Sequence, residues 1–130
     1  MEYADLAEKV IGAAYDVYNN MDFGFLESVY ENCLKIELEE KGLSLKQLEP
    51  IEVKYRGRAV GHFVADLIVE DTVIVELKAI KALNEAHEVQ LVNYLVAIGK
   101  PVGLLINFSE KKVDVKRKVP VLESVRTEKS

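Results

Sequence analysis

The chain has 130 residues, of which 49% are hydrophobic and 30% are charged, a balance that is typical of one globular domain and argues against a disordered chain. Its formal net charge of −5 at pH 7 argues against a protein that binds nucleic acid through a generally basic surface. The single cysteine, Cys33, excludes an internal disulfide bond and a zinc site built from several thiolates.

Two helices are predicted in the first part of the chain. Between residues 6 and 19 apolar side chains recur at steps of three and four, which is the spacing of one helix face. A polar break that contains Gly24 follows this run. A second periodic run begins near Leu26 and stops at Gly42, a residue type that often ends helices.

The rest of the chain predicts strands and one further helix. After Pro50 the chain becomes rich in residues that favour strands. The expected strands cover residues 51–55, 60–69, 72–77, 102–107 and 113–117, and the expected helix covers residues 85–98. The order ααβββαββ predicts an α/β domain in which helices flank a mixed central sheet. We expect residues 1–119 to form this single domain and residues 120–130 to form a C-terminal tail.

Three charged residues interrupt two of the predicted strands. Alternation along residues 63–69 places Asp66 on one face, and alternation along residues 72–78 places Glu76 and Lys78 together. The residues expected to share this face are apolar: Val64, Ile68 and Ile74. An ordinary cross-strand ion pair on a solvated face is the alternative. Because isolated charges are too costly to bury without a partner, the apolar surroundings favour a functional pocket.

The turn between these strands decides whether the charges meet. If residues 70–72 form a three-residue loop, Asp66 lies directly opposite Glu76 on the same face. A two-residue loop would turn the two carboxylates to opposite faces, and the sequence leaves this choice open. In the first register the carboxylates repel each other unless a cation lies between them.

Two carboxylates with room for water suit Mg²⁺ better than zinc, since Mg²⁺ gives up its water reluctantly and usually takes one or two carboxylates. Such an ion can polarise a phosphoryl oxygen and lower the pKa of a bound water. Lys78 could then orient that water or stabilise charge at the phosphorus. The pattern therefore predicts a magnesium-dependent phosphodiesterase, with Mn²⁺ as a substitute ion.

Two motifs resemble known families. Asp66, nine further residues and then Glu76-Leu77-Lys78 resemble the D-x(n)-E-x-K signature of the PD-(D/E)XK nuclease superfamily. The run Gly24-Phe25-Leu26-Glu27-Ser28-Val29-Tyr30 is similar to the GxxExxY motif of a family of small prokaryotic proteins placed in that superfamily. The resemblance covers residues 6–119 and implies a restriction-endonuclease-like core. It departs from the motif at Ala65, where the superfamily's name has proline.

The superfamily pattern implies roles for the residues that match it. It makes Asp66 and Glu76 metal ligands, with the backbone carbonyl of Leu77 as a third. It makes Lys78 the catalytic lysine. The resemblance therefore assigns the D-x9-E-x-K residues to hydrolysis of nucleic acid.

Helical residues are implied at the same site, and each has a structural alternative. Glu27 resembles the helix-borne acid of many members, but a carboxylate near a helix start can also serve as a cap. Gln90 resembles the polar residue of the following helix, and a structural amide is equally compatible. Tyr30 could bond Glu27 or be a core aromatic with its hydroxyl at the edge, and Tyr94 is expected to support the site.

A basic run near the C-terminal end offers contacts to phosphate: Lys111, Lys112, Lys116, Arg117 and Lys118. A solvated edge strand or tail is the alternative for this run. The expected partner is DNA or RNA, and a homodimer or a protein partner could complete the binding groove. No segment resembles a membrane span or signal peptide, so we expect a cytoplasmic protein without membrane contact. Two other functions remain open, a catalytically silent interaction protein and a magnesium-dependent hydrolase of a small phosphoester, which would suit the negative charge.

Overall fold

A computed structural model of the chain describes residues 2–121. In order, its elements are α1 (Tyr3–Met21), α2 (Glu27–Glu40), β1 (Leu45–Tyr55), β2 (Arg58–Val69), β3 (Val73–Lys78), α3 (Glu85–Ile98), β4 (Val102–Phe108) and β5 (Val113–Lys118). This order confirms the predicted α/β class. The expected tail, residues 120–130, lies outside the described residues from residue 122 onward. Within residues 2–121 no helix is long and apolar enough to cross a membrane.

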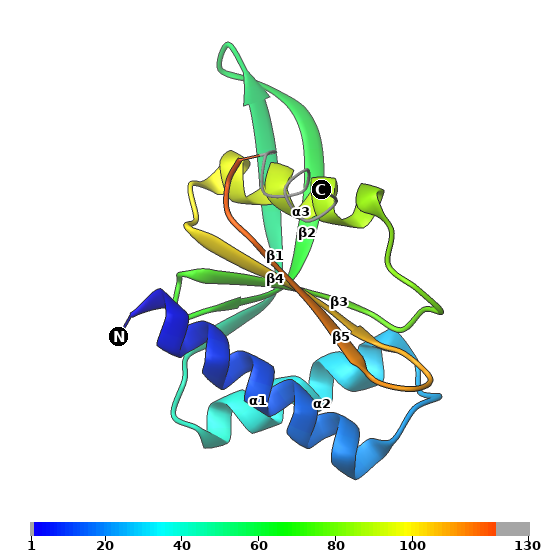
Figure 1. Ribbon diagram of the computed structural model, residues 1–130. Coiled ribbons are helices and arrows are strands. Elements are labelled where there is room, and N and C mark those ends of the chain that lie inside the picture. Colours follow the sequence, from blue (N-terminus) through cyan, green and yellow to red (C-terminus); the bar gives the residue numbers. More distant parts are fainter. Residues whose placement is uncertain (1, 122–130) are drawn as a thin grey trace.

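The five strands form one mixed sheet in the order β1-β2-β3-β4-β5. β3 and β4 run parallel and are connected through α3, while every other neighbouring pair is antiparallel. Figure 1 shows α1 and α2 on one side of the sheet and α3 on the other. The sheet is therefore covered on both faces, which is typical of sheets that contain parallel strands.

Side-chain alternation in β3 divides the core into two clusters. Val75 and Leu77 pack toward α1 and α2, whereas Ile74 packs toward α3. Glu76 and Lys78 share the alternation of Ile74 and therefore lie on the α3 side. The two charges of β3 thus stand on the same face, as the sequence predicted.

The pairing of β1 with β2 omits one pair of residues, Leu48 and Asp66, although the pairs before and after it are in register. Leu48 has φ of 54°, in the left-handed region that few residues with a side chain adopt. The alternation of β2 shifts at this point, because Ala65 packs toward α3 while Leu67 packs toward α1 and α2. Such irregularities re-aim side chains within a sheet.

This shift corrects the predicted surroundings of Asp66. Ile68 and Ile74 are buried under α3 as expected, but Val64 is 52% exposed. Simple alternation placed Val64 beside the charges because it assumed an unbroken strand. The irregularity at Asp66 turns Val64 to the surface instead.

β1 begins at Leu45, ahead of the predicted start after Pro50. The sequence pattern placed the start of this strand only after Pro50. Proline cannot donate a hydrogen bond to a neighbouring strand, so within sheets it is found in edge strands or at strand starts. β1 is an edge strand of the sheet, so one of its sides has no strand partner. Pro50 is tolerated within β1 for this reason, and it pairs in register with Val64.

Candidate functional site

The turn between β2 and β3 has the three-residue form. Val69 pairs with Val73, which leaves residues 70–72 as the loop. Pairing between the two strands continues only to Leu67 and Val75. Beyond that pair the strands part, and Asp66 and the end of β3 face each other across the gap.

Asp66 bridges this gap through its side chain and its backbone. Its Oδ2 accepts a hydrogen bond of 2.8 Å from the Leu77 N–H. The Asp66 N–H lies 3.3 Å from Oε1 of Glu76 and donates to it. The two carboxylates are therefore held next to each other at the place where β2 and β3 separate.

Glu76 is a buried carboxylate, with only 7% of its surface exposed. Burial and then the neighbouring charge of Asp66 raise its pKa to about 9, although the Asp66 N–H and Lys78 act in the opposite direction. A raised pKa of this size is common for carboxylates at functional sites. Glu76 therefore holds a proton near neutral pH unless a cation replaces that proton.

α2 brings two more acids to the gap. Glu27 is the first residue of α2, and burial followed by the charge of Asp66 raises its pKa, while Lys78 lowers it. No side-chain hydrogen bond caps the start of α2, so of the structural alternative for Glu27 only the favourable position of its charge in the first helical turn remains. Glu27 therefore lies close enough to Asp66 and Lys78 for their charges to act on it.

Glu31 is a buried acid of this site that the sequence analysis missed. It lies one helical turn after Glu27, and its Oε2 accepts a hydrogen bond of 2.6 Å from Nε2 of Gln47. Burial raises the pKa of Glu31, the bond from Gln47 lowers it, and the charge of Asp66 raises it again. The four-residue spacing from Glu27, on the same helix face, was the available signal.

Tyr30 fixes the loop that leads into α2. Its buried hydroxyl donates a 2.6 Å hydrogen bond to the carbonyl of Asp22 and lies 3.4 Å from the N–H of Phe25, which donates to it. Its ring stacks on Phe108, with the ring centroids 4.4 Å apart. Gly24, between these contacts, has φ of 111°, which favours glycine. Tyr30 is thus a core aromatic that positions the start of α2, and no bond to Glu27 is present.

Changing Tyr30 to phenylalanine should lower the free energy of unfolding by about 1 kcal/mol, because the carbonyl of Asp22 loses its donor while the ring stacking remains. Urea unfolding measures the difference. Tyr3→Phe is the matched control, since Tyr3 is exposed. Equal stabilities of the two variants would contradict the role of the Tyr30 hydroxyl.

α3 places one aromatic residue against the carboxylates. Tyr94 is buried, and burial followed by the charges of Glu76 and Asp66 raises its pKa to about 12. Its ring lies 5.0 Å from that of Phe63, between centroids. Gln90, one turn earlier, is exposed and lines a shallow pocket with Phe63 and Tyr94. Tyr94 is therefore close to the carboxylates, and Gln90 lies at the rim.

Asn107 holds the chain just after Lys78. It is almost fully buried, its Oδ1 accepts from the Ile80 N–H and its Nδ2 donates to the Ile80 carbonyl, both at 2.9 Å. In the sheet register Asn107 is the partner of Lys78. The sequence analysis missed this residue, although a lone amide in the apolar strand β4 was a visible signal. Asn107 therefore limits the freedom of the segment that carries Lys78.

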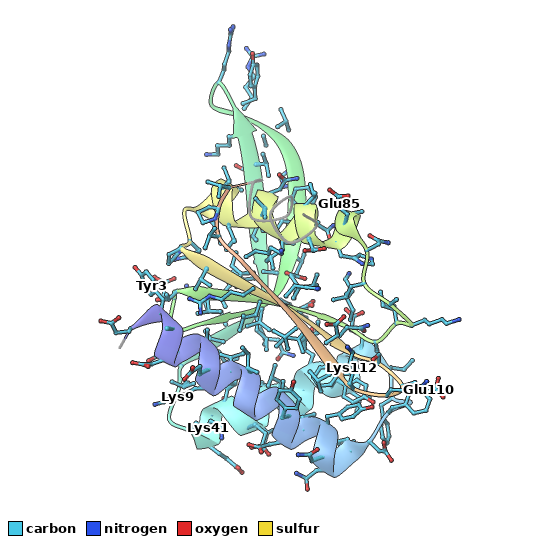
Figure 2. The ribbon with its side chains drawn as sticks, viewed as in Figure 1. Tyr3, Lys9, Lys41, Glu85, Glu110 and Lys112 are labelled. Atoms are coloured by element: carbon cyan, nitrogen blue, oxygen red, sulfur yellow. The ribbon has the colours of Figure 1, made fainter. Side chains whose placement is uncertain are left out.

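The basic run divides between surface and core. Figure 2 shows Lys112 and Glu110 at the turn between β4 and β5. Lys111 and Lys112 are exposed and line a pocket of about 640 Å³ beyond the end of β3. Lys116 is half-buried and Arg117 is exposed.

Lys118 is a correction to the expected phosphate contacts. The residue is fully buried, and its Nζ lies 2.7 Å from Oε1 of Glu88 on α3. A buried lysine requires such a partner, because desolvation of an unpaired charge is very costly. Lys118 thus joins β5 to α3 and has no surface to offer a phosphate.

The donors at the gap fit a magnesium ion. In residues 2–121 no three acidic, histidine or cysteine side chains gather closely enough to enclose a metal. Mg²⁺ requires less, because it usually keeps water or substrate oxygens as its remaining ligands. Asp66 and Glu76 supply two adjacent carboxylates. The N–H and C=O of a strand residue point to the same neighbour, so the Leu77 carbonyl is directed to the side of Asp66.

One large cavity lies away from these carboxylates. It has a volume of about 890 Å³ and lies between the β1–β2 hairpin and α3. None of the site carboxylates lines it. This cavity is therefore separate from the acidic gap, which is identified by its carboxylates.

One solved structure supports the fold. The crystal structure of SSO0001 has a TM-score of 0.59 and 16% identity, and the match covers 78% of this chain and 56% of that one. An alkaline exonuclease from Laribacter hongkongensis, LHK-Exo, has a TM-score of 0.47 and 13% identity, with coverage of 72% and 57%. This chain thus spans little more than half the length of either structure. No curated protein matches the chain.

One family matches at the level of sequence. It is described as the PD-(D/E)XK nuclease superfamily, and the match covers residues 4–118. The matched segment contains all five strands and the gap with Asp66, Glu76 and Lys78. The chain therefore belongs to the PD-(D/E)XK nuclease superfamily.

Proposed function

We propose that this protein is a magnesium-dependent phosphodiesterase that hydrolyses nucleic acid at the gap between β2 and β3. The observation that carries the proposal is the pair formed by Asp66 and the buried Glu76, whose pKa is raised to about 9. Two adjacent carboxylates repel each other when both are ionised, and a divalent cation between them removes that repulsion. Asp66, Glu76 and the Leu77 carbonyl would hold Mg²⁺, and Mn²⁺ would be a substitute.

The residues around this pair can each take part in hydrolysis. Bound Mg²⁺ would supply Lewis acidity toward a phosphoryl oxygen and the attacking water. Lys78 would present its ammonium group to the phosphate oxygen on which charge develops. Glu27 would accept a proton from water, since its raised pKa moves it toward the range suited to a general base.

Further residues would bind the substrate. The hydroxyl of Tyr94 stays protonated, with a pKa of about 12, and would donate a hydrogen bond near the carboxylates. Gln90, at the rim of the site, would contact the phosphate backbone. The accessible members of the basic run are proposed phosphate contacts: Lys111, Lys112, Lys116 and Arg117.

We also assign the chain to the GxxExxY family within the superfamily. Each residue that names the motif has a distinct physical task. Gly24 adopts a positive φ, Glu27 faces Asp66 and Lys78, and Tyr30 ties the loop together. Gly24 and Tyr30 fix the loop before α2, and this loop positions Glu27 toward the gap.

A small phosphoester is a second candidate substrate. The net charge of −5 repels a long polyanion more than a single phosphate group. The same residues would act on either substrate, so the two candidates differ in substrate length. A comparison of oligonucleotides with mononucleotide diesters would separate them.

The first test is titration calorimetry of Mg²⁺ and Mn²⁺ into the wild type and Asp66→Ala. We expect the wild type to bind the ion and the variant to lose binding, because it keeps only one carboxylate of the pair. Asp5→Ala is the control, since Asp5 is an exposed acid on α1. Cleavage of single-stranded, duplex and RNA oligonucleotides is then measured in the same buffers. Equal metal affinity in the wild type and Asp66→Ala would reject Asp66 as a metal ligand.

A further inference from the structure

The hairpin of β1 and β2 continues beyond the sheet as a two-stranded ribbon, which projects at the top of Figure 1. β2 pairs with β3 only over Leu67–Val69, whereas its pairing with β1 extends to Tyr55 and Arg58. At about 3.3 Å per residue, the ribbon reaches about 26 Å from Asp66 to Arg58. The tip thus stands well away from the body of the domain.

The tip of the ribbon is basic although the chain is acidic overall. Lys54, Arg56 and Arg58 are all exposed. Lys54 lies 3.6 Å from Glu52, a weak pair at the surface. Across residues 2–121 no carboxylate forms a salt bridge with Arg56 or Arg58. The ribbon therefore ends in two guanidinium groups whose charge is not neutralised.

The turn itself gives no reason for an arginine at position 56. Arg56 and Gly57 have φ of 50° and 78°, so the two-residue turn has positive φ at both positions. Such hairpin turns strongly favour Asn-Gly, because asparagine tolerates this conformation and most other side chains do not. Arg56 has its guanidinium 5.4 Å from the ring centroid of the exposed Tyr55. A residue that is unfavourable for the backbone is better explained by what its side chain binds.

We propose that the ribbon tip binds the phosphates of duplex DNA and guides the duplex to the acidic gap; this inference rests on the proposed nuclease function. A two-stranded ribbon fits the major groove of B-form DNA, whereas the deep, narrow major groove of A-form RNA does not admit it. Arginine is well suited to phosphate because its guanidinium can donate two parallel hydrogen bonds. The tip adds positive charge to a gap whose acids outnumber its one lysine, Lys78.

The test is binding of a fluorescent DNA duplex by anisotropy in EDTA, where no metal-dependent cleavage occurs. The variant combines Arg56→Asn, which suits the turn, with Arg58→Gln. Loss of two phosphate contacts should weaken binding and reduce its salt dependence. The increase in Kd between 50 and 200 mM salt should become about tenfold smaller than in the wild type. Thermal unfolding checks that the variant remains folded.

The matched control combines Lys9→Gln with Lys41→Gln. It removes the same charge from α1 and from the residue after α2, and Figure 2 labels both lysines. Equal loss of binding in the control and the ribbon variant would overturn the inference. Ribbon-dependent binding to duplex RNA or anionic vesicles, but not to duplex DNA, would also overturn it.

This experiment separates the two proposals. Ribbon-dependent DNA binding without cleavage in Mg²⁺ would support the ribbon inference and count against the nuclease function. Cleavage by a ribbon variant that binds DNA as tightly as the wild type would overturn the ribbon inference alone.

Discussion

Replacing Lys78 by alanine should lower the rate of phosphodiester cleavage by about 100- to 1,000-fold, the loss typical of removing one group that stabilises transition-state charge. Lys78 follows Glu76 by one pleat, and its charge acts on both Glu76 and Glu27. It supplies no oxygen ligand, so affinity for Mg²⁺ should stay largely intact. The expected result is therefore a protein that binds the ion and the substrate but hydrolyses very slowly.

Single-turnover cleavage with saturating enzyme measures this loss, and titration calorimetry of the same preparation measures metal binding. Lys46→Ala is the control, because Lys46 is an exposed lysine on β1. Cleavage by Lys78→Ala at the rate of the control would remove Lys78 from the mechanism. Loss of both metal binding and cleavage would instead mean that Lys78 supports the geometry of the ligands.

Glu76→Gln should change how the stability of the metal-free protein depends on pH. Glu76 has a pKa near 4.5 when unfolded and about 9 when folded. Between these values the folded state keeps a proton that the unfolded state has released. The stability that Glu76 contributes is therefore greatest below pH 4.5 and falls as pH rises toward 9, by up to about 1.4 kcal/mol per pH unit.

Glutamine cannot lose a proton in this range, so Glu76→Gln should remove that decline and be more stable than the wild type near pH 8. Urea unfolding in EDTA at pH 5, 7 and 8.5 measures the free energies. Glu8→Gln is the control, because Glu8 is exposed on α1. Parallel pH profiles for the wild type and Glu76→Gln would contradict the raised pKa.

The same raised pKa predicts that Mg²⁺ displaces a proton from Glu76. Calorimetry at pH 7 in buffers of different ionisation enthalpy should detect release of about one proton per ion bound. Affinity for Mg²⁺ should increase as pH rises toward 9, since less work is then needed to remove the proton. A binding enthalpy that is the same in every buffer would argue that Glu76 is already ionised before the metal arrives.

The local sequence pattern was enough to predict the order of helices and strands and the shared face of Glu76 and Lys78 on β3. The spacing of apolar residues in α1 and α3 reflects which helix face is buried, and this depends on neighbours three and four residues away. Glu76 and Lys78 share a face because successive strand residues alternate. These features need only short-range geometry, so the sequence by itself determined them.

The tertiary structure alone decided which charges are buried and what they meet. Glu31 lies beside Asp66 because α2 packs against the sheet, and Lys118 is buried because α3 presents Glu88 to it. The unpaired Leu48 and Asp66 shift the alternation of β2, which no pattern within β2 revealed. A charge's burial depends on partners from distant segments, because the desolvation energy is recovered only when those segments pack together. The sequence therefore determined the elements and the residues of β3, and long-range packing decided which acids surround them.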